Sequence, residues 1–94
     1  MALNISFTES AEADLRSIHS YLSDYSEAKA IEYIARILQS IRVLDRFPLL
    51  GRVGRVEGTR EWSLPGLPYI AVYRIKSETE LEVLTIKHER QQYP

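Results

Sequence analysis

The spacing of hydrophobic residues divides the chain into an N-terminal helical part and a C-terminal part rich in strands. Residues 3–7 alternate apolar and polar side chains, which is typical of a half-buried strand. An apolar residue then recurs every three or four positions, and this spacing predicts an amphipathic helix over about residues 9–24. Its apolar stripe consists of Ala11, Leu15, Ile18, Leu22 and Tyr25.

The same spacing predicts a second amphipathic helix over about residues 27–46. Thr8 and Ser26 precede the two helices, and both are residue types that cap helix N-termini. Pro48 limits the second helix because the residue before a proline avoids helical geometry. The connection between the helices is short, so they are expected to form an antiparallel hairpin that exposes little apolar surface outside its stripes. The second stripe consists of Ala30, Ile34, Ile37, Ile41 and Leu44, widened by Ile31 and Leu38.

Alternating patterns after Pro48 predict three strands, at residues 60–64, 69–76 and 81–87. The element order is therefore β-α-α-β-β-β. It predicts an α+β fold in which an N-terminal strand and an antiparallel helical hairpin precede a three-stranded antiparallel sheet. We expect a single domain over residues 1–94, because the chain is short and contains no linker or repeat.

Composition narrows the class of protein. The chain has no cysteine, so disulfides and thiolate metal sites are excluded and a cytoplasmic location is expected. No run approaches the roughly 20 apolar residues that span a bilayer, so no membrane partner is expected. The net charge is −1, but residues 46–76 carry six bases against two acids. This asymmetry predicts a basic functional face in the second half, with solvated loop charge as the alternative.

The segment 51–61 combines three arginines with three glycines and is the strongest candidate for a site. Glycine permits close approach of the backbone, and the arginine guanidinium suits phosphate or carboxylate. The alternative is that these arginines are solvated or pair with Glu57 and Glu61. The predicted target-binding residues are Arg52, Arg55, Arg60 and Glu61.

Three further residues are candidates for chemistry. Arg74 lies within the predicted strand 69–76, where a charge needs a partner or a site. His88 ends the last strand and could act as acid or base near neutral pH, or serve only as a polar strand end. Tyr93, in the polar tail, could anchor a partner or cover the sheet edge. The sequence lacks metal-ligand spacing, a Ser-His-Asp set and nucleotide-binding glycine motifs, so no metal or cofactor is predicted.

Five short motifs in order resemble the RelE/ParE superfamily of type II toxin–antitoxin toxins, over about residues 5–94. They are Ala11-x-x-Asp14-Leu15-x-x-Ile18-x-x-Tyr21, Phe47-Pro48-x-x-Gly51-Arg52, Gly58-Thr59-Arg60-Glu61, Pro68-Tyr69-Ile70-x-x-Tyr73-Arg74 and His88-x-x-Gln91-x-x-Pro94. The resemblance implies a helical hairpin against a twisted antiparallel sheet. It also implies a toxin held inactive in a hetero-oligomer with a cognate antitoxin.

Two mechanisms occur in that superfamily. ParE-like members poison DNA gyrase and have no established hydrolytic site, whereas RelE-like members cut mRNA in the ribosomal A site without metal. A RelE-like endoribonuclease would use Arg60 and Arg74 on the phosphate and His88 as acid or base, with Tyr93 a weaker candidate. The long hairpin, the motif at residues 58–61 and the scarcity of lysine favour gyrase inhibition. The ribonuclease remains the alternative, and so does a binding module without toxicity.

Overall fold

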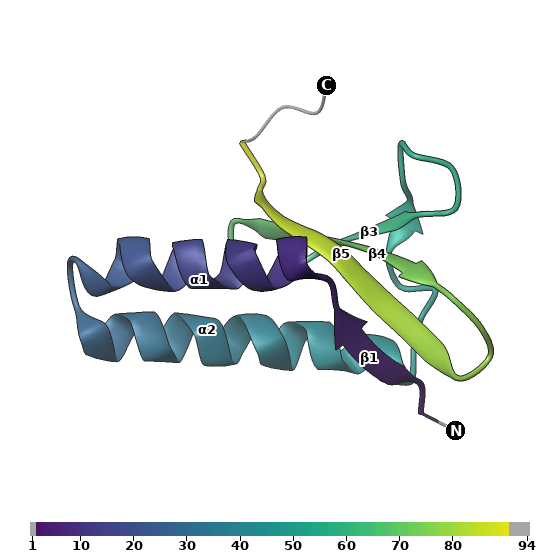
Figure 1. The fold of residues 1–94 in the computed structure, drawn as a ribbon, viewed down its shortest axis with the longest axis horizontal. Coiled ribbons are helices and arrows are strands. Elements are labelled where there is room, and N and C mark those ends of the chain that lie inside the picture. Colours follow the sequence, from purple (N-terminus) through teal and green to yellow (C-terminus); the bar gives the residue numbers. More distant parts are fainter. Residues whose placement is uncertain (1, 91–94) are drawn as a thin grey trace.

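A computed structural model describes residues 2–90 as a helical hairpin packed beside one sheet (Figure 1). The helices are α1, Glu9–Ser23, and α2, Glu27–Arg42. The strands are β1 (Asn4–Phe7), β2 (Arg52–Val53), β3 (Arg60–Ser63), β4 (Tyr69–Ile75) and β5 (Glu80–His88). The predicted α+β class and the helical hairpin are therefore correct. No helix within residues 2–90 is both long and apolar enough to cross a membrane.

The sheet is larger than the predicted three strands. Within residues 2–90 it has five strands in the order β1-β5-β4-β3-β2. β1 joins it by pairing parallel to β5, whereas the other neighbours pair antiparallel. The three-stranded prediction was wrong because β2 is only two residues long and shows no alternation. The pairing of β1, moreover, depends on a partner 76 residues away, since Ile5 aligns with Leu81.

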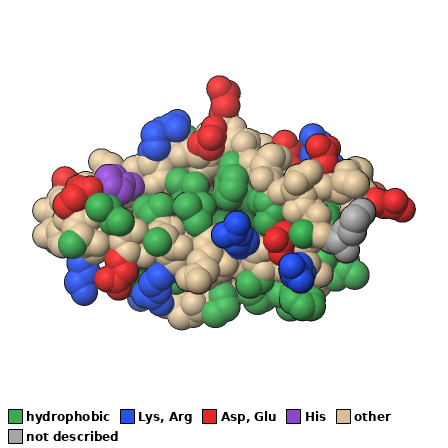
Figure 2. Space-filling model, turned by 90° about the horizontal axis from the view of Figure 1, so that it is seen from below, with side chains coloured by type: hydrophobic (Ala, Val, Ile, Leu, Met, Phe, Trp, Pro, Cys, Tyr) green, Lys and Arg blue, Asp and Glu red, His purple; other side chains and the backbone are tan. Residues whose placement is uncertain are grey.

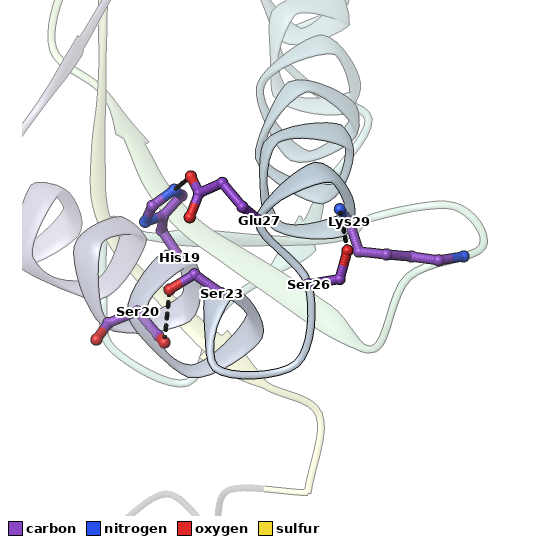
Figure 3. A network of polar contacts seen from close by, with 6 residues as sticks. All are labelled: His19, Ser20, Ser23, Ser26, Glu27 and Lys29. Atoms are coloured by element: carbon purple, nitrogen blue, oxygen red, sulfur yellow. Dashed lines mark hydrogen bonds and ion pairs between the residues drawn. The ribbon is translucent and has the colours of Figure 1, made fainter.

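The predicted caps start both helices. The amide of Ala11 donates to the Thr8 hydroxyl at 3.1 Å, and the amide of Lys29 donates to the Ser26 hydroxyl at 3.2 Å. Figure 3 shows the connection between the helices, where the His19 ring lies 3.2 Å from the Glu27 carboxylate. The two bonds made by Thr8 and Ser26 satisfy amides that would otherwise lack partners at each helix start.

The second helix ends earlier than predicted. Its α-helical part stops at Arg42, and residues Val43–Asp45 form a 3₁₀ turn, η1. The tighter turn buries Leu44 completely and lets the carbonyl of Asp45 accept from the amide of Leu3 at 2.8 Å. The apolar spacing cannot distinguish these geometries, because one 3₁₀ turn keeps Leu44 on the same side.

The core lies between the hairpin and the sheet. It consists of Ala11, Ile37, Ile41, Leu44, Leu64, Leu67, Tyr69, Ala71, Tyr73, Leu81, Val83 and Ile86. The predicted apolar stripes are only partly covered by the sheet and by each other. Tyr25, Ile31 and Leu38 are 76%, 59% and 40% exposed although the stripes include them. Figure 2 shows hydrophobic side chains reaching the surface in a band across one face, with isolated charged side chains among them.

Candidate functional site

The arginine–glycine segment folds over a buried carboxylate. Glu61 lies on β3 directly opposite Arg52 on β2, and its side chain is only 3% exposed. One carboxylate oxygen accepts from the Arg52 guanidinium at 3.0 Å, and the other accepts from the backbone amide of Arg55 at 3.3 Å. Glu61 therefore closes the loop from within, and its contacts are those of a structural residue.

Arg60 and Tyr73 hold the segment that precedes β2. The Arg60 Nε donates to the carbonyl of Gly51 at 2.9 Å. The Tyr73 hydroxyl accepts from the amide of Gly51 at 3.0 Å and donates to the carbonyl of Pro48 at 2.6 Å. A Cβ on Gly51 would lie 2.7 Å from the Tyr73 hydroxyl, so this close approach requires glycine.

Arg74, within strand β4, forms an ion pair. Its guanidinium lies 2.9 Å from the carboxylate of Glu82, the residue aligned with it on β5. Successive residues of a strand point to opposite faces, so Arg74 and Tyr73 are on opposite sides of the sheet. Because Arg60 pairs directly with Tyr73, Arg60 lies on the opposite side from Arg74 as well.

His88 lies at the other end of β4. It is aligned with Tyr69, and the two rings meet edge to face with centroids 5.6 Å apart. Both residues line a hollow of about 560 Å³ beneath α1. Burial raises the pKa of the Tyr69 hydroxyl, and Tyr33 and Tyr21 raise it further. Tyr93 lies outside the described residues.

The candidate residues therefore do not form a single site. Arg52, Arg60 and Glu61 come together around the β2–β3 loop, but Arg60 lies on the opposite face of the sheet from Arg52, Glu61 and Arg74. His88 is aligned with Tyr69, five residues along β4 from Arg74, which corresponds to about 16 Å of strand. Among residues 2–90, no cluster of histidine, aspartate and glutamate could hold a metal ion.

Hydrophobic patterns and the choice of candidate residues missed two features of the structure. Asp14 on α1 accepts from the Thr85 hydroxyl at 2.6 Å and from the amide of Ile86 at 2.9 Å, beyond the point where β1 stops pairing with β5. The segment 47–50 presents three exposed apolar side chains in a fixed turn. The run Phe-Pro-Leu-Leu was a usable signal for the second feature, since it belongs to neither a helical nor an alternating pattern.

Two solved structures with a similar arrangement come from toxin–antitoxin systems. A chain of the chromosomal ParDE toxin–antitoxin system from P. aeruginosa matches with a TM-score of 0.82 and 27% identity, covering 93% of this chain and 96% of that chain. A chain of the toxin–antitoxin complex RelBE2 from Mycobacterium tuberculosis matches with a TM-score of 0.60 and 26% identity, covering 94% and 99%. The fold therefore places the chain in a class of small proteins that includes these chains from toxin–antitoxin systems.

Sequence comparison identifies the family within this class. The profile described as "ParE toxin of type II toxin-antitoxin system, parDE" matches residues 5–93. A protein of Sinorhizobium fredii named "Putative toxin Y4kP" is 37% identical over 90 residues, covering 96% of this chain and 92% of that protein. The chain belongs to the ParE toxin family. The predicted membership of the RelE/ParE superfamily and the predicted role as a type II toxin are confirmed.

Proposed function

We propose that this toxin inhibits DNA gyrase through protein–protein contacts and that a cognate antitoxin neutralises it. The observation that carries the choice of target is the separation of Arg60, Arg74 and His88. Two of these lie on opposite faces of the sheet, and the third is about 16 Å along β4. Cleavage of RNA by these groups would require them around one phosphate, because acid–base and electrostatic catalysis act at hydrogen-bond distance.

The electrostatics of the arginines support the same choice. The guanidinium of Arg74 is neutralised by Glu82 and that of Arg52 by Glu61, while Arg60 donates to backbone carbonyls. A site for a phosphorane needs cations that are directed at the phosphate. These three cations are instead directed at groups within the protein, which favours a binding surface over a ribonuclease centre.

The antitoxin has a suitable docking edge on β1. This strand lies at the end of the sheet order, so its outer edge can accept another strand. Beside it, a hollow of about 430 Å³ between β1 and α2 is lined by Ile5, Phe7, Leu38 and Arg42, among others. An extended antitoxin segment could pair with the edge and place apolar side chains in the hollow. This supports a hetero-oligomer of toxin and antitoxin.

A purified assay tests the proposed target. We expect the toxin to inhibit supercoiling by DNA gyrase or to produce gyrase-dependent double-strand breaks, and we expect the purified antitoxin to prevent this. Unchanged gyrase activity at saturating toxin would overturn the proposal. Cleavage of mRNA in the ribosomal A site, mapped by primer extension, would establish the ribonuclease alternative.

Replacement of the candidate catalytic residues distinguishes the two mechanisms. For a gyrase inhibitor, we expect His88→Ala and Arg74→Ala to keep growth arrest within about threefold of the wild type. For a ribonuclease, loss of an acid–base or phosphate-binding group would reduce cleavage by about a hundredfold or more. Growth after induction is the measurement, with circular dichroism as the control that both variants remain folded. Loss of toxicity in folded His88→Ala would argue against gyrase inhibition by binding alone.

A further inference from the structure

The segment 47–50 exposes more apolar surface than a loop of four residues needs. Phe47, Leu49 and Leu50 are 62%, 67% and 47% exposed. With Arg46 and Pro48 they line one hollow of about 390 Å³. Single exposed apolar residues are ordinary on protein surfaces, but a contiguous group indicates an interaction site. We refer to these three side chains as the apolar loop patch.

The backbone beneath the patch is fixed by side chains from the sheet. Tyr73 binds the carbonyl of Pro48 and the amide of Gly51 through its hydroxyl, and Arg60 donates to the carbonyls of Leu49 and Gly51. Because Tyr73 and Arg60 hydrogen-bond these backbone groups, the backbone of the loop is held while its apolar side chains are exposed. A partner that binds here does not have to order the loop, which lowers the entropic cost of association.

The charge around the patch indicates what it binds. Residues 42–56 contain four arginines but only one acid, Asp45. All four are exposed; Arg46 lines the same hollow as the patch, whereas the Arg52 guanidinium is paired with Glu61. A second copy of this chain would bring two arginine-rich rims together, which is unfavourable. A surface with an apolar centre and acidic surroundings complements the patch.

We propose that the apolar loop patch is the contact surface for the toxin's protein target and that it docks on an apolar protein surface bordered by carboxylates. The proposal rests on the proposed function, since it assigns the inhibitory contact to this loop. The arginine–glycine segment then acts as the scaffold, and Phe47, Leu49 and Leu50 make the contact. The loop leads into β2, at the opposite end of the sheet order from β1, but it begins near that strand, because the carbonyl of Asp45 accepts from the amide of Leu3.

The test compares the double variant Phe47→Ser with Leu49→Ser against the matched control Tyr25→Ser. Tyr25 is 76% exposed and lies in the connection between α1 and α2. Figure 1 shows this connection at the end of the hairpin that points away from the sheet. We expect the double loop variant to need at least about tenfold more protein for half-maximal gyrase inhibition and to lose growth arrest. Antitoxin affinity, melting temperature and the activity of Tyr25→Ser should match the wild type.

The outcomes separate this proposal from the proposed target. Wild-type toxin could leave gyrase unaffected while the double loop variant fails to arrest growth. The gyrase assignment would then be wrong, but the patch would still be the contact surface for a different protein target. If the double loop variant arrests growth like the wild type, the contact surface is wrong whatever the target. Equal loss of antitoxin binding would assign the patch to the antitoxin, and conversion of a dimer to a monomer would assign it to a second copy. Either result overturns the proposal.

Discussion

Replacing Tyr73 with phenylalanine should lower the free energy of unfolding by about 2–4 kcal/mol. The ring is fully buried, and its hydroxyl is the hydrogen-bond partner of the Gly51 amide and the Pro48 carbonyl. Phenylalanine fills the same space but leaves both backbone groups without that partner. For a domain of this size, such a loss lowers the melting temperature by at least about 10 °C, measurable by thermal denaturation.

The matched control for this variant is Tyr33→Phe. Tyr33 is half-buried, and its ring lies beneath the guanidinium of Arg36, with 5.5 Å between Cζ and the ring centroid. Phenylalanine keeps that ring, so the melting temperature should change by no more than about 3 °C. If Tyr73→Phe were as stable as Tyr33→Phe, the hydroxyl would not hold the loop. The rigid presentation of the apolar loop patch would then lose its main support.

Replacing Asp14 with alanine should destabilise the protein by about 2–3 kcal/mol. One of its carboxylate oxygens accepts from both the Thr85 hydroxyl and the Ile86 amide. β1 pairs with β5 only as far as Val83, so Asp14 supplies an acceptor to a part of β5 that lacks this neighbouring strand. Alanine leaves two part-buried donors without an acceptor. Chemical denaturation at neutral pH measures the loss.

The substitution Asp14→Asn provides the control because an amide oxygen can accept from the same two donors. We expect the Asp14→Asn variant to remain within about 1.5 kcal/mol of the wild type, since it loses only the additional strength of a charged acceptor. Hydrogen exchange at Ile86 should accelerate in Asp14→Ala and much less in Asp14→Asn. Equal exchange in both variants would show that the carboxylate does not protect this edge.

These two residues stabilise different parts of the surface. Tyr73 fixes the loop that carries the proposed target contact, and Asp14 closes β5 beside the hollow beneath α1. Both act by accepting from backbone amides that the strand ladder leaves unpaired. Since an unsatisfied buried amide is costly, each side chain stabilises the segment whose amide it accepts from.

Local patterns were sufficient for the helices and for the longer strands. The caps at Thr8 and Ser26 and the three-to-four spacing predicted both helices, because these signals depend on residues close together in the chain. They also supported the resemblance to the RelE/ParE superfamily. The end of α2 was not predictable in this way, because it depends on the contact of Asp45 with the distant Leu3. The strand β2 was not predictable because two residues are too few to show alternation.

For the site, the sequence by itself determined which residues were available, and the tertiary structure decided what they do. Composition alone identified the arginine–glycine segment as unusual. Only the pairing of strands places Glu61 beneath Arg52, places Arg60 and Arg74 on opposite faces of the sheet, and places His88 at the far end of β4. The sequence does not show whether a charged side chain will contact solvent, a ligand or a carboxylate, because only folding brings that partner near. The exposed loop at residues 47–50 follows the same rule, since burial is a property of the packed chain.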